Sequence, residues 1–257
     1  MIDLHCHILP GIDDGPRTLD ESLELALAAV AAGTTTIVAT SHVHWDYPDN
    51  SAALIAEKVQ EVNAMLLDQN VDLEVRPGAE VALTRALDLP DAELAALTLG
   101  GGPWLLLECP LSPVVAGVER GIDALRQRGH EQIVLAHPER VPVFQRDPEL
   151  LARLVHSGML TSVTAGAFTG QFGKDVQRFA RRLLADGLVH DVASDAHSST
   201  RRPPALGPTL RDAGLDVEQI AHLTHAVPLA ILQGTPLPPA PAMPEAKRGA
   251  LARLLGR

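Results

Sequence analysis

The sequence predicts an α/β fold, a distorted barrel in which β-strands alternate with α-helices. Short apolar runs rich in β-branched residues, such as 34–40, alternate with longer segments in which apolar residues recur at helical spacing. This alternation favours parallel strands joined by helices. The length of 257 residues suits one barrel of repeated β/α units. We therefore expect the C-terminal ends of the strands to meet at one end of the barrel.

The amino-acid composition excludes several classes of protein. Hydrophobic residues make up 46% and charged residues 21%, which is typical of a globular domain rather than a disordered or fibrous one. The formal net charge of −11 argues against nucleic acid as a partner bound nonspecifically through a broad basic face, although it leaves room for a local basic patch. The N-terminus lacks a basic segment followed by an apolar run, and no window approaches the roughly 18 apolar residues of a transmembrane helix. We expect a cytoplasmic protein.

The two cysteines, Cys6 and Cys109, lie far apart in the sequence and form no CxxC pair. This spacing favours neither a disulfide framework nor a structural zinc site. Both follow or precede polar residues on predicted strands. We interpret them as small buried apolar side chains.

The first predicted strand covers residues 2–8. Side chains alternate between the two faces of a strand, so His5 and His7 project to one side and Cys6 to the other. Two imidazoles on one face can bind one metal ion, although histidine pairs are also common as ordinary core or surface residues. The pair therefore needs support from the rest of the chain.

Helices and strands then alternate along the first half of the chain. Residues 18–21 form a capping-box pattern before a helix that Gly33 ends. The strand at 34–40 leads to Ser41 and His42. Asn50 or Ser51 caps a second helix that runs to about residue 68. The strand at 73–76 then places Glu80 just past its end.

The second half continues the pattern. Leu105, Leu106 and Leu107 form a buried strand that Glu108 follows directly. The remaining predicted elements are helix 117–128, strand 132–136, helix 148–156, strand 160–164, helix 175–185 and strand 190–193. His137 and Arg140 follow strand 132–136, and Asp195 and His197 follow the last strand, where they share a face.

A proline-rich segment ends the predicted domain, which covers residues 1–233. Residues 234–257 contain five prolines and then a short basic tail. The tail at 245–257 carries three leucines among one lysine and three arginines. It is either a short amphipathic helix that touches a partner or an anionic surface, or, as we expect more often for a terminus, a solvated tail.

Polar side chains at the strand exits carry the functional prediction. Any one of them alone is best explained as a satisfied polar residue or a helix cap. Eight at equivalent positions would repel one another and lose solvation unless a cation compensates. The set therefore predicts a multi-metal site at the C-terminal ends of the strands, made by His5, His7, His42, Glu80, Glu108, His137, Asp195 and His197.

Two arginines near these exits indicate the substrate. Bound metals activate water and neutralise charge on phosphoryl oxygens. Arg140 and Arg202 supply guanidinium groups that bind phosphate oxygens in bidentate fashion, so they favour a phosphate ester over a peptide. Arg201 is better read as a surface ion-pair partner. The loop with His44, Trp45 and Tyr47 fits either substrate contact or ordinary packing.

Several histidines and several other kinds of catalytic site can be set aside. Surface or core roles are the default for His130, His156, His190, His222 and His225. A cysteine phosphatase needs an arginine six positions after its cysteine, but Ile12 and Val115 stand there. Neither a GxSxG elbow nor a GxxxxGK[ST] phosphate loop is present. These three kinds of catalytic site are therefore excluded.

Seven segments resemble one known family. They are IDLHCHILPGIDDGP at 2–16, ATSHVH at 39–44, RPGAEV at 76–81, LLLECP at 105–110, VLAHPER at 134–140, SVTAGAFTGQFG at 162–173 and ASDAHSSTRRPP at 193–204. Together they resemble the polymerase-and-histidinol-phosphatase (PHP) superfamily, and within it the bacterial manganese-dependent tyrosine-protein phosphatases of capsule and exopolysaccharide operons. The resemblance extends to about residue 233.

The resemblance implies a PHP-type distorted barrel with up to three metals. Carried over by position, it implies one metal at His5, His7, Glu80 and Asp195, a second at Asp14, His42 and His197, and a third at Glu108 and His137 with Glu80 bridging. Asp14 enters only through the resemblance, and Asp13 is left as a turn residue. Ser41 and Val43 depart from the family pattern, which leads us to expect a differently shaped rim.

The implied activity is that of a metal-dependent protein-tyrosine phosphatase. Its metals would be two or three divalent ions, manganese first, with zinc, iron, cobalt or magnesium as alternatives. Its partner would be a phosphotyrosine-bearing protein, a bacterial tyrosine kinase that regulates polysaccharide synthesis. One alternative is a small-molecule phosphomonoesterase resembling histidinol phosphatase. The other is a regulatory module without activity, which the full set of ligands disfavours.

Overall fold

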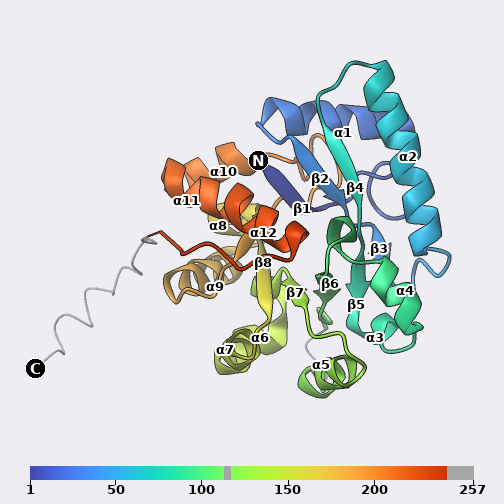
Figure 1. Cartoon of the computed structure of the whole chain (residues 1–257). Coiled ribbons are helices and arrows are strands. Elements are labelled where there is room, and N and C mark those ends of the chain that lie inside the picture. The colour runs from blue at the N-terminus through green and yellow to red at the C-terminus, as the bar shows by residue number, and fades with distance from the viewer. Residues whose placement is uncertain (113–116, 242–257) are drawn as a thin grey trace, which may run out of the picture.

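The computed structural model describes residues 1–112 and 117–241, and Figure 1 shows a ring of strands with helices around it. The strands are β1 (Ile2–Cys6), β2 (Thr36–Ala39), β3 (His42–Val43), β4 (Glu74–Pro77), β5 (Glu80–Ala82), β6 (Leu105–Glu108), β7 (Ile133–Ala136), β8 (Leu160–Thr164) and β9 (Asp191–Ala193). The helices are α1 (Leu19–Ala31), α2 (Ala52–Asp68), α3 (Leu83–Ala86), α4 (Asp91–Ala96), α5 (Val118–Gln127), α6 (Pro142–Arg146), α7 (Pro148–His156), α8 (Ala165–Thr169), α9 (Lys174–Ala185), α10 (Leu206–Asp212), α11 (Val217–Ala221) and α12 (Val227–Gln233). Short 3₁₀ turns lie at Leu99–Gly101 and Pro138–Arg140, and a π-helical turn lies at His222–Ala226.

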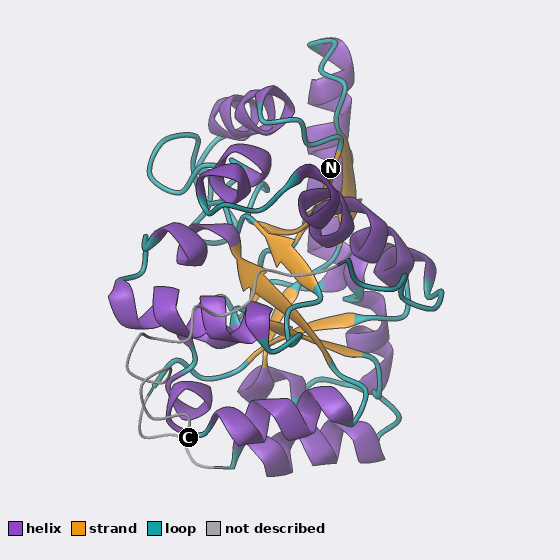
Figure 2. Cartoon of the chain, turned by 90° about the vertical axis from the view of Figure 1, so that its left-hand side faces the viewer, coloured by secondary structure: helices purple, strands orange, loops and turns teal. Residues whose placement is uncertain are grey.

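All strand pairings are parallel. One sheet has the order β1-β2-β4, and the other has the order β3-β5-β6-β7-β8-β9. Because β2 leads into β3 and β4 into β5 after two residues each, these strands are halves of two interrupted strands. After β9 the chain returns to β1, where the Asp195 amide donates to the His5 carbonyl at 2.8 Å and the His7 amide donates to the Ala196 carbonyl at 2.9 Å. The distorted barrel predicted from the sequence is thus confirmed (Figure 2).

An irregularity in β1 decides which way its histidines point. Asp3 pairs with Ile37 and Cys6 with Ala39, so β1 uses three steps where β2 uses two. One extra residue in a strand reverses the alternation beyond it. Before the bulge Leu4 packs in the cluster inside the barrel, whereas Cys6 packs with the helices outside. His5 and His7 therefore both face inward, at the end where the strands finish.

The other end of the barrel interior is filled by apolar side chains. Leu4, Val38 and Leu106 pack there with Val227 and Ile231 of α12. Figure 1 shows α12 beside β1. A larger apolar cluster lies between the outer face of the strands and the surrounding helices. These two layers of packing hold the backbone of each strand in place up to its C-terminal end.

The helix caps agree with the sequence prediction, except that one capping side chain has a different hydrogen-bond partner. The Ser51 hydroxyl caps α2 by accepting from the Leu54 amide at 3.3 Å. Thr18 caps α1, but the carboxylate of Glu21 accepts from the amide of Arg17, not of Thr18, at 2.6 Å. The expected capping box is therefore only half formed. Its second half secures the turn before α1.

Several details differ from the sequence prediction. The first strand ends at Cys6, earlier than expected, and α10 to α12 were missed. Cys6 and Cys109 are buried and free, as predicted. In the described part of the chain, no helix has the length and apolar character needed to cross a membrane. Residues 242–257, including the proposed basic helix, lie outside the described residues, and the domain boundary at 233 stays a prediction.

Candidate metal centre

The strand ends bring four of the predicted site residues into contact. His5 Nε2 lies 3.3 Å from His7 Nε2 and 3.1 Å from Glu80 Oε2. Asp195 Oδ1 lies 3.4 Å from His5 Nε2 and 3.5 Å from His7 Nε2. All four side chains are almost fully buried. The donor atoms of these residues, which come from both ends of the chain, thus form one group.

A second group lies beside the first and is more open to solvent. Asp14 Oδ1 is 3.2 Å from His197 Nε2 and 3.5 Å from His42 Nε2. The ring of His7 stacks on that of His197, with 3.9 Å between centroids. The Asp14 side chain is 52% exposed, so this group faces the outside of the barrel end. His7 joins the two groups.

The third group surrounds the second oxygen of Glu80. His137 Nε2 lies 2.6 Å from Glu80 Oε1 and 3.7 Å from Glu108 Oε1. His42 Nδ1 lies 3.1 Å from Glu80 Oε2, so the ring of His42 has one nitrogen toward Glu80 and the other toward Asp14. The nine residues implied by the resemblance are therefore contiguous. Their assignment as ligands stays a prediction.

The donor set fits divalent metal ions. Ligands that share an ion at about 2.1 Å have donor atoms about 3 to 3.5 Å apart, which is the spacing found here. Glu80 Oε2 is buried without a hydrogen-bond partner among the described residues, yet it lies within 3.3 Å of nitrogens of His5, His7 and His42. Such an oxygen would be costly unless a cation lay beside it. Mixed imidazole and carboxylate ligands suit manganese, iron, cobalt and zinc.

The carboxylates have strongly perturbed pKa values. Burial opposes ionisation of Glu80, but His5 and His137 hold its pKa well below the usual range. Burial likewise opposes ionisation of Asp195, and His5 and His7 keep its pKa low. Burial and the charge of Glu80 raise the pKa of Glu108 to about 8. Carboxylates crowded in this way require positive charge nearby.

Asp13 is a site residue that sequence reasoning missed. Its Oδ2 lies 2.9 Å from His7 Nδ1 and accepts from the His42 amide at 3.1 Å, while Oδ1 accepts from the Gly15 amide at 2.9 Å. The Asp13 side chain is completely buried. A carboxylate on one nitrogen of a ligating histidine orients the ring and fixes its tautomer. One signal in the sequence could have identified Asp13: a ligating histidine such as His7 needs a partner of this kind.

Arg140 and Arg202 come together as expected. Both guanidinium groups donate to Asp195 Oδ2, while Oδ1 of the same carboxylate faces His5 and His7. Phe172 supports them, with its ring centroid 4.9 Å from the Arg140 guanidinium carbon and 5.9 Å from that of Arg202. Phe172 was not predicted as a site residue. The two positive groups therefore lie against the first group of donors.

The loop after β3 contributes to the wall of the site. The Tyr47 ring lies parallel to the His42 ring with 5.7 Å between centroids. The Asn50 amide donates to the carbonyls of Ile12 and His42, at 2.9 and 2.8 Å, and so connects this loop to the turn that holds Asp13. Ser41 and Val43 are buried and line neither of these two pockets beside the centre, and the expectation of a differently shaped rim stays a prediction.

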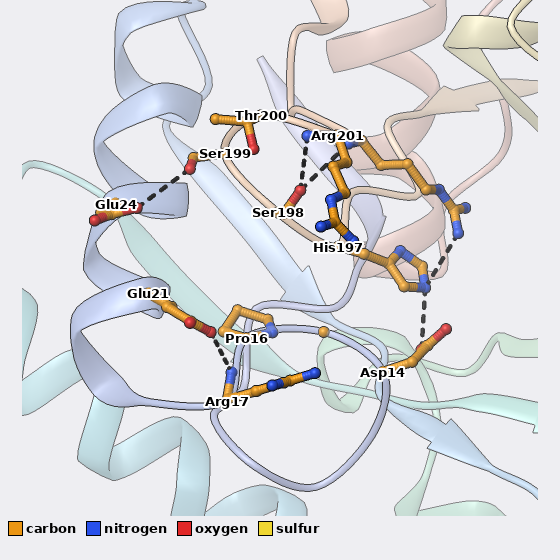
Figure 3. Close-up of a pocket in the computed structure, with 12 residues that line it drawn as sticks. Asp14, Pro16, Arg17, Glu21, Glu24, His197, Ser198, Ser199, Thr200 and Arg201 are labelled. Atoms are coloured by element: carbon orange, nitrogen blue, oxygen red, sulfur yellow. Dashed lines mark hydrogen bonds and ion pairs between the residues drawn. The ribbon is translucent and has the colours of Figure 1, made fainter.

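Two pockets adjoin the centre. One, of about 430 Å³, is lined by Asp14, His42, His44, Asp46, Tyr47, Ala82, Leu83, Thr84, Glu108, Pro110 and Leu111. The other, of about 540 Å³, lies between the turn before α1 and the loop after β9, and Figure 3 shows its lining residues. Both include Asp14. The centre can therefore be reached from two sides.

Of the other histidines, His130 and His190 are held by groups away from the centre. His130 lies 3.0 Å from Asp91. His190 is largely buried, and its Nδ1 accepts from the Thr161 amide at 3.2 Å. Burial and the charge of His222 lower the pKa of His190 to about 4. These histidines have the structural roles that the sequence favoured.

The chain is similar in sequence to a known family and to several known proteins. Residues 1–220 match the family described as capsular polysaccharide synthesis, CpsB/CapC. The tyrosine-protein phosphatase YwqE of Bacillus subtilis is 36% identical over 202 residues, which cover 79% of each chain. The tyrosine-protein phosphatase CpsB of Streptococcus pneumoniae is 30% identical over 211 residues, covering 79% of this chain and 86% of CpsB.

Solved structures support the same relationship. One of the crystal structures of YwqE and CpsB, described as metal-dependent tyrosine phosphatases, has a TM-score of 0.79 at 33% identity and covers 94% of this chain and 99% of its own. A β-aspartyl dipeptidase from Fervidobacterium islandicum has a TM-score of 0.60 at 14% identity, covering 90% of this chain and 72% of its own, which shows a shared fold alone. The resemblance to the PHP superfamily is thus confirmed, and the chain belongs to the CpsB/CapC family.

Proposed function

We propose that this protein is a metal-dependent phosphatase that hydrolyses phosphotyrosine in proteins. Its relatives YwqE and CpsB are named tyrosine-protein phosphatases, and their crystal structures are described as those of metal-dependent enzymes. The observation that carries the proposal is Asp195. One of its oxygens faces the histidines of the first donor group, and the other accepts from Arg140 and Arg202. A phosphate ester bound by the two arginines would therefore lie against the metal ligands.

The proposed ligands are the nine residues that converge at the strand ends. They are His5, His7, Asp14, His42, Glu80, Glu108, His137, Asp195 and His197. We propose two or three divalent ions, with manganese as the first candidate and zinc, iron, cobalt or magnesium as alternatives. When bound, such ions supply Lewis acidity toward phosphoryl oxygens and the activation of a water molecule as the nucleophile.

The protein's own residues bind and orient the phosphate. Guanidinium groups match phosphate oxygens in bidentate geometry, so Arg140 and Arg202 are the proposed substrate-binding and catalytic residues. Their common contact with Asp195 holds the two forks side by side before substrate arrives. In the reaction a bond forms between the water oxygen and phosphorus, and the bond from phosphorus to the tyrosyl oxygen breaks. A phenolic oxygen leaves readily because its pKa is only about 10.

The pocket of about 430 Å³ favours an aromatic substrate. It lies next to His42 and Glu108, and Tyr47, Leu83 and Leu111 give it apolar and aromatic walls. Leu111 is 41% exposed although it is a large apolar residue. A phenyl ring placed here would bury apolar surface, whereas a small polar phosphate ester would not. This supports phosphotyrosine over a histidinol-phosphate-like substrate.

We further propose that the physiological substrate is a phosphorylated bacterial tyrosine kinase that controls capsular or exopolysaccharide synthesis. The family description, capsular polysaccharide synthesis, supports this assignment.

The test combines metal analysis with a substrate panel. The purified protein is assayed on one peptide that carries phosphotyrosine or phosphoserine, and on histidinol phosphate, before and after chelation and after manganese is added back. We expect two or three metals per chain, loss of activity on chelation, recovery with manganese and a preference for phosphotyrosine. Faster turnover of histidinol phosphate would favour the small-molecule enzyme. A metal-free, inactive protein that still binds a kinase would favour a regulatory module.

A further inference from the structure

The pocket of about 540 Å³ beside the centre has a charge arrangement that the reaction does not use. Arg202, His197 and Asp14 form its inner wall, which it shares with the proposed catalytic centre. Arg17 and Arg201 line it farther out. Figure 3 shows their side chains entering the pocket from opposite sides, Arg17 from the turn before α1 and Arg201 from the loop after β9.

The two outer arginines are available to a ligand. Among residues 1–112 and 117–241, neither the Arg17 nor the Arg201 side chain forms a hydrogen bond or an ion pair that would occupy it, and both residues are exposed. The sequence had suggested a surface ion pair for Arg201, and the described residues contain no such pair. Only the backbone amides of these residues are bonded, to Glu21 and Ser198 at 2.6 and 2.9 Å.

Each of the three acidic residues that line the pocket already has a partner. Asp14 Oδ1 lies 3.2 Å from His197 Nε2, Glu21 Oε2 accepts from the Arg17 amide at 2.6 Å, and Glu24 Oε2 accepts from the Ser199 hydroxyl at 3.4 Å. Ser198, Ser199 and Thr200 add hydroxyl groups to the same wall. Two free guanidinium groups with hydroxyl groups nearby recognise carboxylates and phosphates.

We propose that this pocket binds an anionic side chain of the substrate next to the phosphotyrosine. The inference rests on the proposed function, since it names a preference of the same site. With a formal net charge of −11, the protein as a whole repels an acidic peptide. Arg17 and Arg201 provide local attraction beside Arg202, in a pocket that shares Asp14 with the pocket proposed for the tyrosine ring. An acidic residue and a second phosphorylated residue are the two sources of this anion.

The experiment compares peptides that differ only beside the phosphotyrosine. One carries glutamate there, one carries a second phosphotyrosine, and one carries glutamine. For the unmodified protein loaded with manganese, we expect the KM of either anionic peptide to be about threefold to tenfold below that of the glutamine peptide, as for two exposed ion pairs. Equal KM values for all three would overturn the proposal. A preference for only one anionic peptide identifies the source.

Matched variants separate this pocket from general charge effects. Arg17→Gln with Arg201→Gln should abolish the preference while turnover of p-nitrophenyl phosphate stays unchanged. Arg153→Gln with Arg178→Gln removes the same charge from exposed side chains on α7 and α9 and should leave the preference intact. Glu24→Gln should strengthen it by about twofold. If the α7 and α9 variant lost the preference equally, long-range charge and not the pocket would be responsible.

The control peptide keeps this proposal distinct from the proposed function. Turnover of the glutamine peptide without any anionic preference contradicts the pocket alone. Failure to hydrolyse any of the phosphotyrosine peptides contradicts the phosphatase function itself. Raising the salt concentration to about 1 M should also reduce the preference, because exposed charges are then screened within about 3 Å.

Discussion

At one end of the barrel interior, Leu4, Val38 and Leu106 pack against α12. At the other end, where the strands finish, His5 and His7 crowd together with Glu80 of β5. The apolar end gains stability from burial, at about 25 cal/mol per Å². The polar end places carboxylates and imidazoles in a buried space, which is unfavourable without a cation. The comparison teaches that the packed end holds the strands in place while the polar end provides the chemistry.

The largest effect should follow from removing the carboxylate charge that several histidines share at the polar end. Glu80→Gln keeps the shape of the side chain but removes the charge that faces His5, His42 and His137. We expect activity to fall by more than about 100-fold, the upper range for groups that merely orient ligands. Phosphatase assays and metal analysis of the folded variant provide the measurement. Full activity with full metal content would refute the role of Glu80.

The apolar end should respond in stability instead. Leu106→Ala should lower the free energy of unfolding by about 3 kcal/mol, since Leu106 is fully buried. Turnover per folded molecule should change little. Leu67→Ala, at a position that is 80% exposed, is the matched control and should change stability by less than about 0.5 kcal/mol. Chemical denaturation compares the two. A large loss of turnover in folded Leu106→Ala would mean that the two ends are not separable.

A smaller effect on activity is expected at Asp13. Asp13→Asn replaces the carboxylate that contacts His7 Nδ1 and accepts from the backbone amide of His42. The His42 amide is itself a donor, so the NH2 group of an asparagine cannot bond to it. We expect manganese affinity or activity to fall by about 10- to 100-fold. A titration of activity against manganese concentration distinguishes a loss of manganese affinity from a loss of activity at saturating manganese. An unchanged titration curve would show that Asp13 only closes the turn.

The smallest effect concerns pH and a histidine before β9, at the apolar end. Burial and the charge of His222 lower the pKa of His190 to about 4, against about 6.5 in the unfolded chain. The unfolded state therefore binds the proton first. Stability is complete above pH 6.5 and falls as the pH drops toward 4, by about 2 kcal/mol after allowance for partial exposure.

His190→Asn keeps an acceptor for the Thr161 amide and removes the titrating ring. Urea unfolding at pH 7 and pH 5 should show a smaller loss of stability for this variant than for the unmodified protein. Equal losses would assign the pH dependence to other groups.

The sequence predicted the parts of this comparison that depend on periodicity. Buried strands such as β6 and β7 have continuous apolar runs. The polar residues that end or follow these runs, Glu108 and His137, could be placed at one edge without coordinates. The two arginines followed from the same argument. Helices α10 to α12 are short and interrupted by a π-helical turn, so no regular spacing marked them.

Other features depend on contacts that no local pattern encodes. Asp13 and Asp14 are neighbours with the same chemistry, and only the folded turn shows that one is buried on His7 while the other is half exposed. The bulge in β1 appears only when its register with β2 is known. The pocket between Arg17 and Arg201 joins segments more than 180 residues apart in the sequence. Tertiary structure alone brings them together.

The central claim is that the polar end of the barrel binds divalent metals through the nine converging residues. Anomalous diffraction from crystals grown with manganese tests it most directly. We predict two or three anomalous peaks within coordination distance of the His5, Glu80 and His197 groups. Manganese peaks only at the protein surface, or none at all in a protein that retains activity, would contradict the claim.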